Sequence, residues 1–344
     1  MRKRIFSILQ YVIFLAGGIF LVWWQLRSLT PEQKNAFLNA LREANYWLIL
    51  PVAAITLLSH LIRALRWKLL MEPLNYNPAL KNVFAVTLVG YFANAAFPRL
   101  GEILKCTFLA RYEKIKVDKL VGTIIVERAF DVVCYIIFIG ITVLIQINVV
   151  GDYVKKILEE IAVSPGFPLW GKLLIVLSIM TGMFLFLKFI FDRFPKNKII
   201  LTVNNFLNGI LEGFRSIKNL KQRWLFILYT ILIWFMYLME IHIAFSAMEG
   251  TAHLGIKAAF SVLTLVTLSM IVTPGGIGSL PVLMQKTLIF YGISDALGTA
   301  FGWLMWGIST GIVIVAGLVA LLLLPYMNKN KKNEISPVDP IQNI

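Results

Sequence analysis

Long apolar runs constrain this chain more than any other feature of its sequence. About 20 consecutive, mostly apolar residues form a helix long enough to cross a bilayer. Apolar residue types make up 58% of the 344 residues, whereas soluble domains contain about 45–50%. Six segments are long enough to span: 5–26, 46–70, 120–147, 169–190, 224–248 and 296–326. The sequence therefore predicts an all-α polytopic membrane protein with about six full transmembrane helices.

The first apolar run begins after three basic residues, as a signal peptide would. It is longer than the apolar part of a signal peptide, however, and Trp23 and Trp24 stand where a small-residue cleavage site is expected. We therefore interpret residues 5–26 as a retained first span.

Two shorter apolar stretches each end in a break rich in proline and glycine. Residues 83–97 lead into Pro98-Arg99-Leu100-Gly101-Glu102, and residues 258–273 lead into Pro274-Gly275-Gly276-Ile277-Gly278. The helical pattern after each break is too short to cross a bilayer at about 1.5 Å per residue. We predict re-entrant hairpins at 83–113 and 258–292. Irregular backbone at membrane depth must be buried in protein or line a wet cavity, so the breaks indicate an interior site.

The distribution of basic residues between the runs predicts the orientation. Lysine and arginine concentrate in the loops that are cytoplasmic when both termini are cytoplasmic, and acidic residues dilute them in the external loops. This favours a multi-pass protein of the cytoplasmic (inner) membrane. The first hairpin then enters from the cytoplasm and the second from outside. The net charge of +15 is explained by loops facing anionic lipid, so no nucleic-acid partner is expected.

The predicted organisation has two halves. Residues 1–148 form the first transmembrane half, 149–168 an external loop, and 169–326 the second half. Each half contains one interrupted hairpin, which suggests an inverted repeat around a site at the membrane midplane, although the halves share no obvious residue-level repeat. Residues 198–220 have the spacing of an amphipathic helix, either in the cytoplasmic interface or packed under the bundle. The polar tail, 327–344, is predicted to be disordered and cytoplasmic.

Charged residues within the apolar runs are the candidate functional residues. A charge at the bilayer centre costs at least about 2.5–3.5 kcal/mol, so charges kept there are usually paired or functional. With the glycine-rich break, they form the predicted substrate-binding set: Arg63, Arg66, Arg99, Glu102, Lys105, Glu127, Arg128, Asp131, Glu240, Pro274, Gly275, Gly276, Gly278 and Lys286.

Structural explanations remain open for several of these residues. Arg66, and less readily Arg63, can reach the cytoplasmic headgroups while Trp67 lies in the aromatic belt. Arg99 and Glu102 can pair simply to hold the turn. Glu127, with its neighbours on the same helix, can form a network that only braces the fold.

The residue types in this set indicate an anionic ligand. The planar guanidinium of arginine binds phosphate through two hydrogen bonds and tolerates low dielectric. Glycine N–H groups at a helix start also favour an anion. An anionic lipid headgroup fits best. Cys106 and Cys134 lack metal-ligand spacing and the three histidines are scattered, so neither a metal nor a cofactor is expected.

Four motifs occur in order: Arg63-Ala-Leu-Arg66-Trp67, Asn94 with Pro98-Arg99-Leu100-Gly101-Glu102, Glu127-Arg128-Ala-Phe-Asp131, and Pro274-Gly275-Gly276-Ile277-Gly278. Together they resemble the lysylphosphatidylglycerol synthase transmembrane-region family. That family is described as flippase-like and includes the membrane half of the multiple peptide resistance factor. The resemblance covers roughly residues 5–325 and implies movement of lipids between leaflets, with re-entrant hairpins lining the path.

The resemblance does not imply lipid synthesis. In the synthases aminoacylation belongs to a separate soluble domain, which we do not expect here because the chain ends about twenty residues after its last span. Two positions depart from the family pattern. Leu280-Pro281 stands where members often carry glutamate, which puts a coupling role for the second hairpin in doubt, and Lys105 stands where members often carry arginine.

Our leading hypothesis is a lipid flippase or transporter for an anionic or aminoacylated phospholipid or a polyprenyl-phosphate lipid. The alternative is a proton-coupled transporter of small solutes or ions, with Glu102, Glu127, Asp131 and Glu240 as a proton relay. A lipid-modifying transferase lacks any recognisable catalytic motif, so we do not expect an enzyme. A partner subunit without transport activity is the remaining reading. The expected partners are membrane lipids, and a homodimer is left open.

The expected pocket is asymmetric and opens toward the inner leaflet. Its cations are Arg63, Arg99 and Arg128, balanced by the carboxylates of Glu102, Glu127 and Asp131.

Overall fold

The computed structural model describes residues 16–25, 27–97, 100–146, 178, 181 and 220–329. The chain divides into two compact units. The first contains residues 1–127 and 217–344, and the second contains residues 128–216. The helical arrangement that positions the candidate site lies in the first unit.

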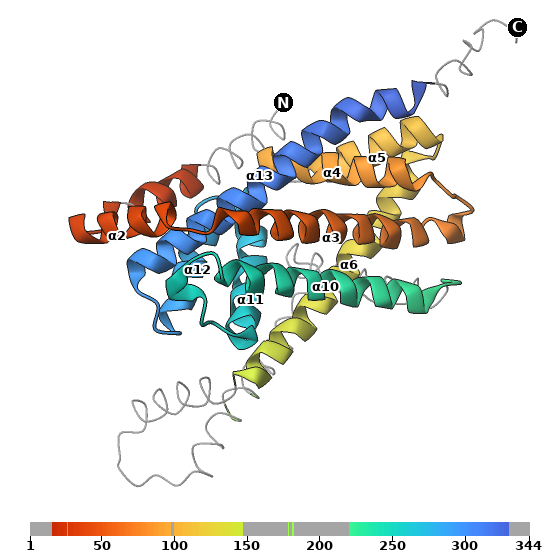
Figure 1. The fold of residues 1–344 in the computed structure, drawn as a ribbon. Coiled ribbons are helices and arrows are strands. Elements are labelled where there is room, and N and C mark those ends of the chain that lie inside the picture. The colour runs from red at the N-terminus through yellow and green to blue at the C-terminus, as the bar shows by residue number, and fades with distance from the viewer. Residues whose placement is uncertain are drawn as a thin grey trace, which may run out of the picture. The chain divides into compact units, whose positions relative to one another are not determined.

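All regular structure in the described residues is helical (Figure 1), which confirms the predicted all-α class. Residues 16–25 are also helical, although they carry no helix label. The longer helices are α2 (Pro31–Arg42), α3 (Ile49–Leu69), α4 (Leu80–Ala96), α5 (Leu100–Glu113), α6 (Val117–Ile145), α10 (Arg223–Phe245), α11 (Ile256–Val272), α12 (Ser279–Ile289) and α13 (Asp295–Met327). The short 3₁₀ turns are η1 (Tyr46–Leu48), η2 (Glu72–Leu74), η3 (Glu249–Thr251) and η4 (Pro274–Gly276).

Within the described residues, four helical segments are long and apolar enough to cross a bilayer: Tyr46–Leu74, Val117–Ile145, Arg223–Phe245 and Asp295–Met327. They match four of the six predicted spans. The first predicted span is described only from residue 16 onward, and 169–190 only at Ser178 and Thr181. The loop at 149–168 and nearly all of the predicted helix at 198–220 and of the tail lie outside the described residues.

The sequence did not predict α2, a short helix between the first two predicted spans. Its start is a capping box, in which the Thr30 hydroxyl accepts from the Gln33 backbone N–H at 3.2 Å. The Gln33 side chain accepts in return from the Thr30 backbone N–H at 2.9 Å. Pro31 occupies the first turn, where its missing N–H costs nothing. Residues 30–33 therefore contained a recognisable helix start.

The first interrupted segment forms a helical hairpin of α4 and α5. A methyl group on Gly101 would overlap the carbonyl oxygen of Gly90, so glycine allows the two backbones to touch. Asn94 of α4 bridges the break. Its side-chain oxygen accepts the Gly101 N–H at 2.8 Å, and its amide donates to Glu102 at 3.3 Å. Asn94 thus satisfies an N–H of the first turn of α5 that has no partner within its helix.

The close approach of Gly90 and Gly101 predicts a large effect for Gly101→Ala. The added methyl group must push α5 away from α4, and overpacking of this kind costs about 1–3 kcal/mol. We expect a lower unfolding temperature for the variant in detergent. Gly122→Ala on α6 is the matched control, because in the described part of the chain no atom beyond its own helix backbone lies within 4 Å of the added carbon. Equal unfolding temperatures for the two variants would rule out this packing.

The second interrupted segment forms α11, the turn η4 and α12. Gly275, Gly276 and Gly278 have φ angles of 59°, 69° and 71°, in the left-handed region that favours glycine. The buried hydroxyl of Ser279 at the start of α12 lies 2.8 Å from that of Ser269 on α11. The glycines therefore make the sharp reversal, and the hydroxyls join the two helices beside it.

The first part of α13 packs along this second hairpin. A Cβ on Gly302 would lie 2.8 Å from the Cα of Pro281 in α12, which indicates direct backbone contact. One turn further along, the Trp306 indole N–H donates to the carbonyl of Gly275 at the hairpin tip, at 3.0 Å. Small residues that let backbones approach are typical of helix contacts inside membranes.

The second part of α13 packs along the first hairpin. A methyl group on Gly317 would overlap Phe92 of α4. Near the end of the helix, the side-chain amides of Asn328 and Asn82 hydrogen-bond to each other in both directions, at 2.8 and 2.9 Å. Asn82 lies in the first turn of α4, at the base of its hairpin.

The two hairpins therefore approach each other from opposite ends of α13 and meet at their tips (Figure 1). A Cβ on Gly275 would lie 3.4 Å from the carbonyl oxygen of Ala95, near the end of α4. α13 contains 33 residues, so it is about 50 Å long at 1.5 Å per residue.

Candidate functional site

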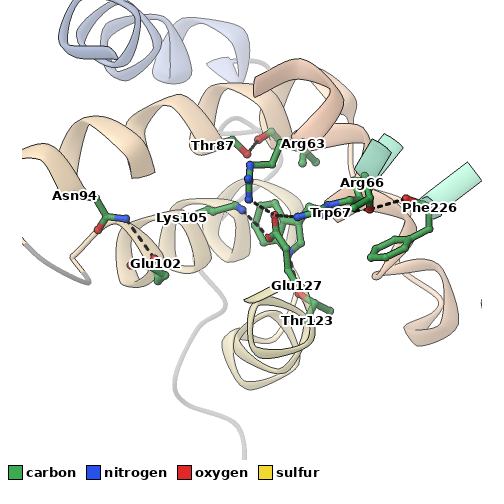
Figure 2. A network of polar contacts seen from close by, with 12 residues as sticks. Arg63, Arg66, Trp67, Thr87, Asn94, Glu102, Lys105, Thr123, Glu127 and Phe226 are labelled. Carbon is green, nitrogen blue, oxygen red and sulfur yellow. Dashed lines mark hydrogen bonds and ion pairs between the residues drawn. The ribbon is translucent and has the colours of Figure 1, made fainter. Parts of the chain in front are cut away.

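Four charged side chains from three helices converge near the first hairpin (Figure 2). Glu127 of α6 lies at the centre. Its Oε1 is 3.3 Å from Arg63 Nη1 and 3.3 Å from Arg66 Nη2, both of α3. Its Oε2 is 3.3 Å from Lys105 Nζ of α5. We call Arg63, Arg66, Lys105 and Glu127 the charge cluster.

The charge cluster is buried. Arg66 is 0% exposed and Glu127 is 2% exposed, while Arg63 and Lys105 retain 7% and 8%. Neither arginine reaches out to a headgroup, so the sequence-based alternative of snorkelling is wrong for both. Trp67 is also 0% exposed, and its indole N–H donates to the Thr123 hydroxyl at 2.9 Å. The interpretation of Trp67 as a belt residue is therefore wrong as well.

Arg66 is fixed in the bundle by α10. Its Nη1 donates to the hydroxyl of Thr230 at 3.3 Å, and its guanidinium lies 5.6 Å from the ring centre of Phe226. Both residues of α10 are buried. Together with Glu127, these contacts make Arg66 the most tightly enclosed cation of the cluster.

Arg63 and Lys105 have different surroundings. Arg63 Nη2 donates to the Tyr237 hydroxyl at 3.0 Å, and its guanidinium lies 5.8 Å from the ring centre of Tyr91. Lys105 Nζ lies 3.8 Å from the ring centre of Trp67, a close cation–π contact. Aromatic faces thus support both cations without adding any further negative charge.

The other charged residues predicted for the site do not belong to the charge cluster as defined above. Glu102 lies one turn before Lys105 on α5 and accepts a hydrogen bond from Asn94. Arg99 lies outside the described residues. Arg128 and Asp131 follow Glu127 on α6 but belong to the second unit. Glu240 is half-buried on α10 and hydrogen-bonds with Thr56 of α3, a partner on another helix.

The predicted residues of the second hairpin form the turn at its tip. Pro274, Gly275 and Gly276 form η4, and Gly278 precedes α12. The Gly276 N–H donates to the Thr273 carbonyl at 3.1 Å, which commits that donor to the turn. Lys286 is exposed on α12.

Sequence reasoning missed several residues that surround the charge cluster. His60, one helical turn before Arg63, is 5% exposed and stacks on Tyr91 with ring centres 4.3 Å apart. The spacing of three residues between His60 and Arg63 was a readable signal. The contacts to Tyr237 and Thr230 depend on how α10 packs against α3, which no local spacing reveals.

The arrangement is suited to an anion. The four side chains of the charge cluster, three cations and one carboxylate, sum to a formal charge of +2. Adding Glu102 still leaves a net positive charge. Buried cations in a low-dielectric environment interact strongly with phosphate and carboxylate groups. Among the described residues, no group of three or more His, Cys, Asp or Glu side chains can hold a metal ion.

Comparison with known proteins gives a family and two relatives. The family described as the lysylphosphatidylglycerol synthase TM region matches residues 7–317. A UPF0104 membrane protein of Methanocaldococcus jannaschii is 22% identical over 300 residues, covering 81% of this chain and 85% of the relative. A UPF0104 membrane protein of Pyrococcus horikoshii is 22% identical over 359 residues, covering 95% and 99%. No solved structure matches the chain significantly.

Proposed function

Because the chain belongs to the lysylphosphatidylglycerol synthase transmembrane-region family, we propose that it moves a phosphate-bearing lipid between the leaflets of the membrane. It is a multi-pass membrane protein with four described candidate spans. The observation that carries the proposal is the charge cluster. Two guanidinium groups and an ammonium group gathered around one carboxylate inside a helical bundle supply donors of the kind that bind a phosphate group.

The hairpin geometry supports the same proposal. Lys105 begins the second turn of the return helix α5, so the charge cluster lies close to the place where the two tips meet. Interrupted helices that meet near the middle of a bundle are the usual setting of a transporter's binding site. A lipid headgroup can cross there while its tails stay in the surrounding hydrocarbon.

The proposal includes an orientation. The α4–α5 hairpin enters from the cytoplasm and the α11–α12 hairpin from outside, with both termini cytoplasmic. Exposed basic residues near the α5–α6 turn support a cytoplasmic base for the first hairpin: Arg111, Lys114 and Lys116.

Single cysteines test the orientation in a background lacking Cys106 and Cys134. We expect His253→Cys, near the base of the second hairpin, to react with an impermeant maleimide added to intact cells. Arg111→Cys, near the base of the first hairpin, should react only after the cells are opened. Both original side chains are exposed, so accessibility does not limit the comparison. Reaction of both sites from one side would exclude opposed hairpins.

Leaflet exchange tests the function. The purified protein is reconstituted into liposomes that carry a fluorescent lipid in both leaflets, and dithionite then quenches the outer leaflet. We expect continued quenching, fed from the inner leaflet, for lipids with anionic headgroups. The panel includes phosphatidic acid, phosphatidylglycerol, lysyl-phosphatidylglycerol and zwitterionic phosphatidylcholine. Exchange no faster than in empty liposomes for every headgroup, together with solute uptake driven by a pH gradient, would favour a solute transporter instead.

A further inference from the structure

The C-terminal end of α13 is tied to the base of the first hairpin by three polar side chains. Asn328 and Asn82 exchange hydrogen bonds at 2.8 and 2.9 Å, and the Asn82 amide also donates to Glu113. Asn82 lies in the first turn of α4, and Glu113 is the last residue of α5. We call these three residues the Asn82 chain. It joins the end of α13 to both arms of the first hairpin.

The N-terminal end of α13 is tied to the second hairpin in the same way. Gln25 Nε2 donates to Gln285 Oε1 at 2.8 Å, and Gln285 Nε2 donates to Asp295 Oδ1 at 2.8 Å. Asp295 is the first residue of α13, and Gln285 lies on the return helix α12. These three residues are the Gln285 chain. Each chain therefore consists of two amides and one carboxylate, and the two chains lie at opposite ends of one helix.

Both chains run from buried amides to a more accessible carboxylate. The four amide side chains are buried, whereas Asp295 is exposed and Glu113 is half-buried. A buried amide is costly when it loses its partner, but a water molecule can replace that partner at little cost. Each chain can therefore exchange its internal hydrogen bonds for bonds to water that enters from its carboxylate end.

The neighbouring contacts between α13 and the hairpins are of another kind. Gly317 lies against Phe92 of α4, and Gly302 lies against Pro281 of α12. Such small-residue surfaces carry no polar group that must find a new partner when the helices shift. Hydrogen bonds between helices in membranes are also modest in strength, so the amide chains are contacts that can break and form again.

From this arrangement we propose that the two chains are gates. The Asn82 chain closes the way to the meeting point of the hairpin tips from the base of the first hairpin, and the Gln285 chain closes it from the base of the second. Both gates are closed in this structure. The proposal deepens the proposed function, on which it rests for the nature of the ligand, and it adds how the site is reached from each side.

A cysteine at the meeting point of the tips reports the opening of each gate. Ala95 is half-buried and lies beside Gly275 of the second hairpin, so Ala95→Cys is introduced into a background without the native cysteines. Asn82→Leu and Gln285→Met keep the size of each central amide and remove its hydrogen bonds. We expect Asn82→Leu to speed reaction with an impermeant maleimide about three- to tenfold from the side of the first hairpin's base only. Gln285→Met should do so from the opposite side only.

The side of the increase separates a gate from a brace. Asn35→Leu, which replaces an exposed amide of α2, is the control and should change neither rate. Amides that only stabilise the bundle predict lower unfolding temperatures without side-specific labelling. Unchanged labelling, or an increase from the same side for both variants, would therefore overturn the gates.

Asp295→Ala covers the case in which a buried substitution prevents folding. It breaks the Gln285 chain at its exposed end, so labelling should again rise from the side of the second hairpin's base. Glu249→Ala, at another exposed carboxylate, is its control. Equal labelling rates for these two variants would contradict the second gate.

A cross-link tests whether the first gate must open during transport. Asn82→Cys combined with Asn328→Cys is joined by a short bis-maleimide, and Asn82→Cys alone receives the same treatment as the control. We expect leaflet exchange to fall to the rate of empty liposomes in the cross-linked protein only. The two proposals fail separately. Side-specific labelling without any leaflet exchange keeps the gates and removes the transport function, whereas unchanged exchange after complete cross-linking does the reverse.

Discussion

Replacing Glu127 with leucine is expected to lower the free energy of unfolding by about 3–5 kcal/mol, the usual cost of removing one partner from a buried ion pair. The variant leaves Arg63, Arg66 and Lys105 without the carboxylate that each contacts at 3.3 Å. Arg66 should contribute most of the loss because it is 0% exposed and cannot turn to water. Thermal and denaturant unfolding in detergent measure the effect.

Glu249→Leu is the matched control for this prediction. Glu249 is an exposed carboxylate in the short turn η3, so its removal should change stability little. Adding Arg66→Leu to Glu127→Leu should recover part of the lost stability, since it removes the buried charge that Glu127 contacts. If the glutamate and its control shift unfolding equally, the charge cluster does not hold the fold together.

Much of the fold was predictable because the membrane imposes lengths that a sequence displays directly. The apolar runs at 46–70, 120–147, 224–248 and 296–326 correspond to the four described candidate spans. The Pro/Gly breaks correctly marked the two helix interruptions, because only glycine adopts the φ angles at Gly275, Gly276 and Gly278 without strain. Short helices in loops, such as α2, were missed because only their capping residues mark them.

The candidate site was predictable only in part. The cost of burying charge singled out Arg63, Arg66, Lys105 and Glu127, and the structure brings these four side chains into contact. Which cation meets which carboxylate depends on how α3, α5 and α6 pack, and this cannot be read from local spacing. The position of Arg66 near a span end favoured snorkelling, whereas packing against α10 buries it completely. His60 was overlooked because a single histidine on an apolar face usually only fills space.

The packing along α13 connects the hairpins to the candidate site. Trp306 binds the tip of the second hairpin, while Gly317 lies against α4 of the first. The two tips also approach each other directly, at Gly275 and Ala95. Lys105 lies in the second turn of α5, the helix that follows the first break.

Leaflet exchange by Lys105→Met is expected to be about ten- to a hundredfold slower than by the wild-type protein. Loss of one charge-assisted contact costs about 1.5–3 kcal/mol. Methionine keeps the length of the side chain, so its packing against Trp67 is retained. Lys119→Met is the matched control, because Lys119 lies on α6 two turns before Glu127 and is exposed.

The most direct test of the central claim is the exchange rate of an anionic fluorescent lipid in liposomes containing the wild-type protein, Lys105→Met or Lys119→Met, each with verified folding. A buried phosphate-binding site predicts fast exchange for the wild type and Lys119→Met, and exchange near that of empty liposomes for Lys105→Met. Equal rates for the two folded lysine variants would contradict it, and the charge cluster would then be a structural brace.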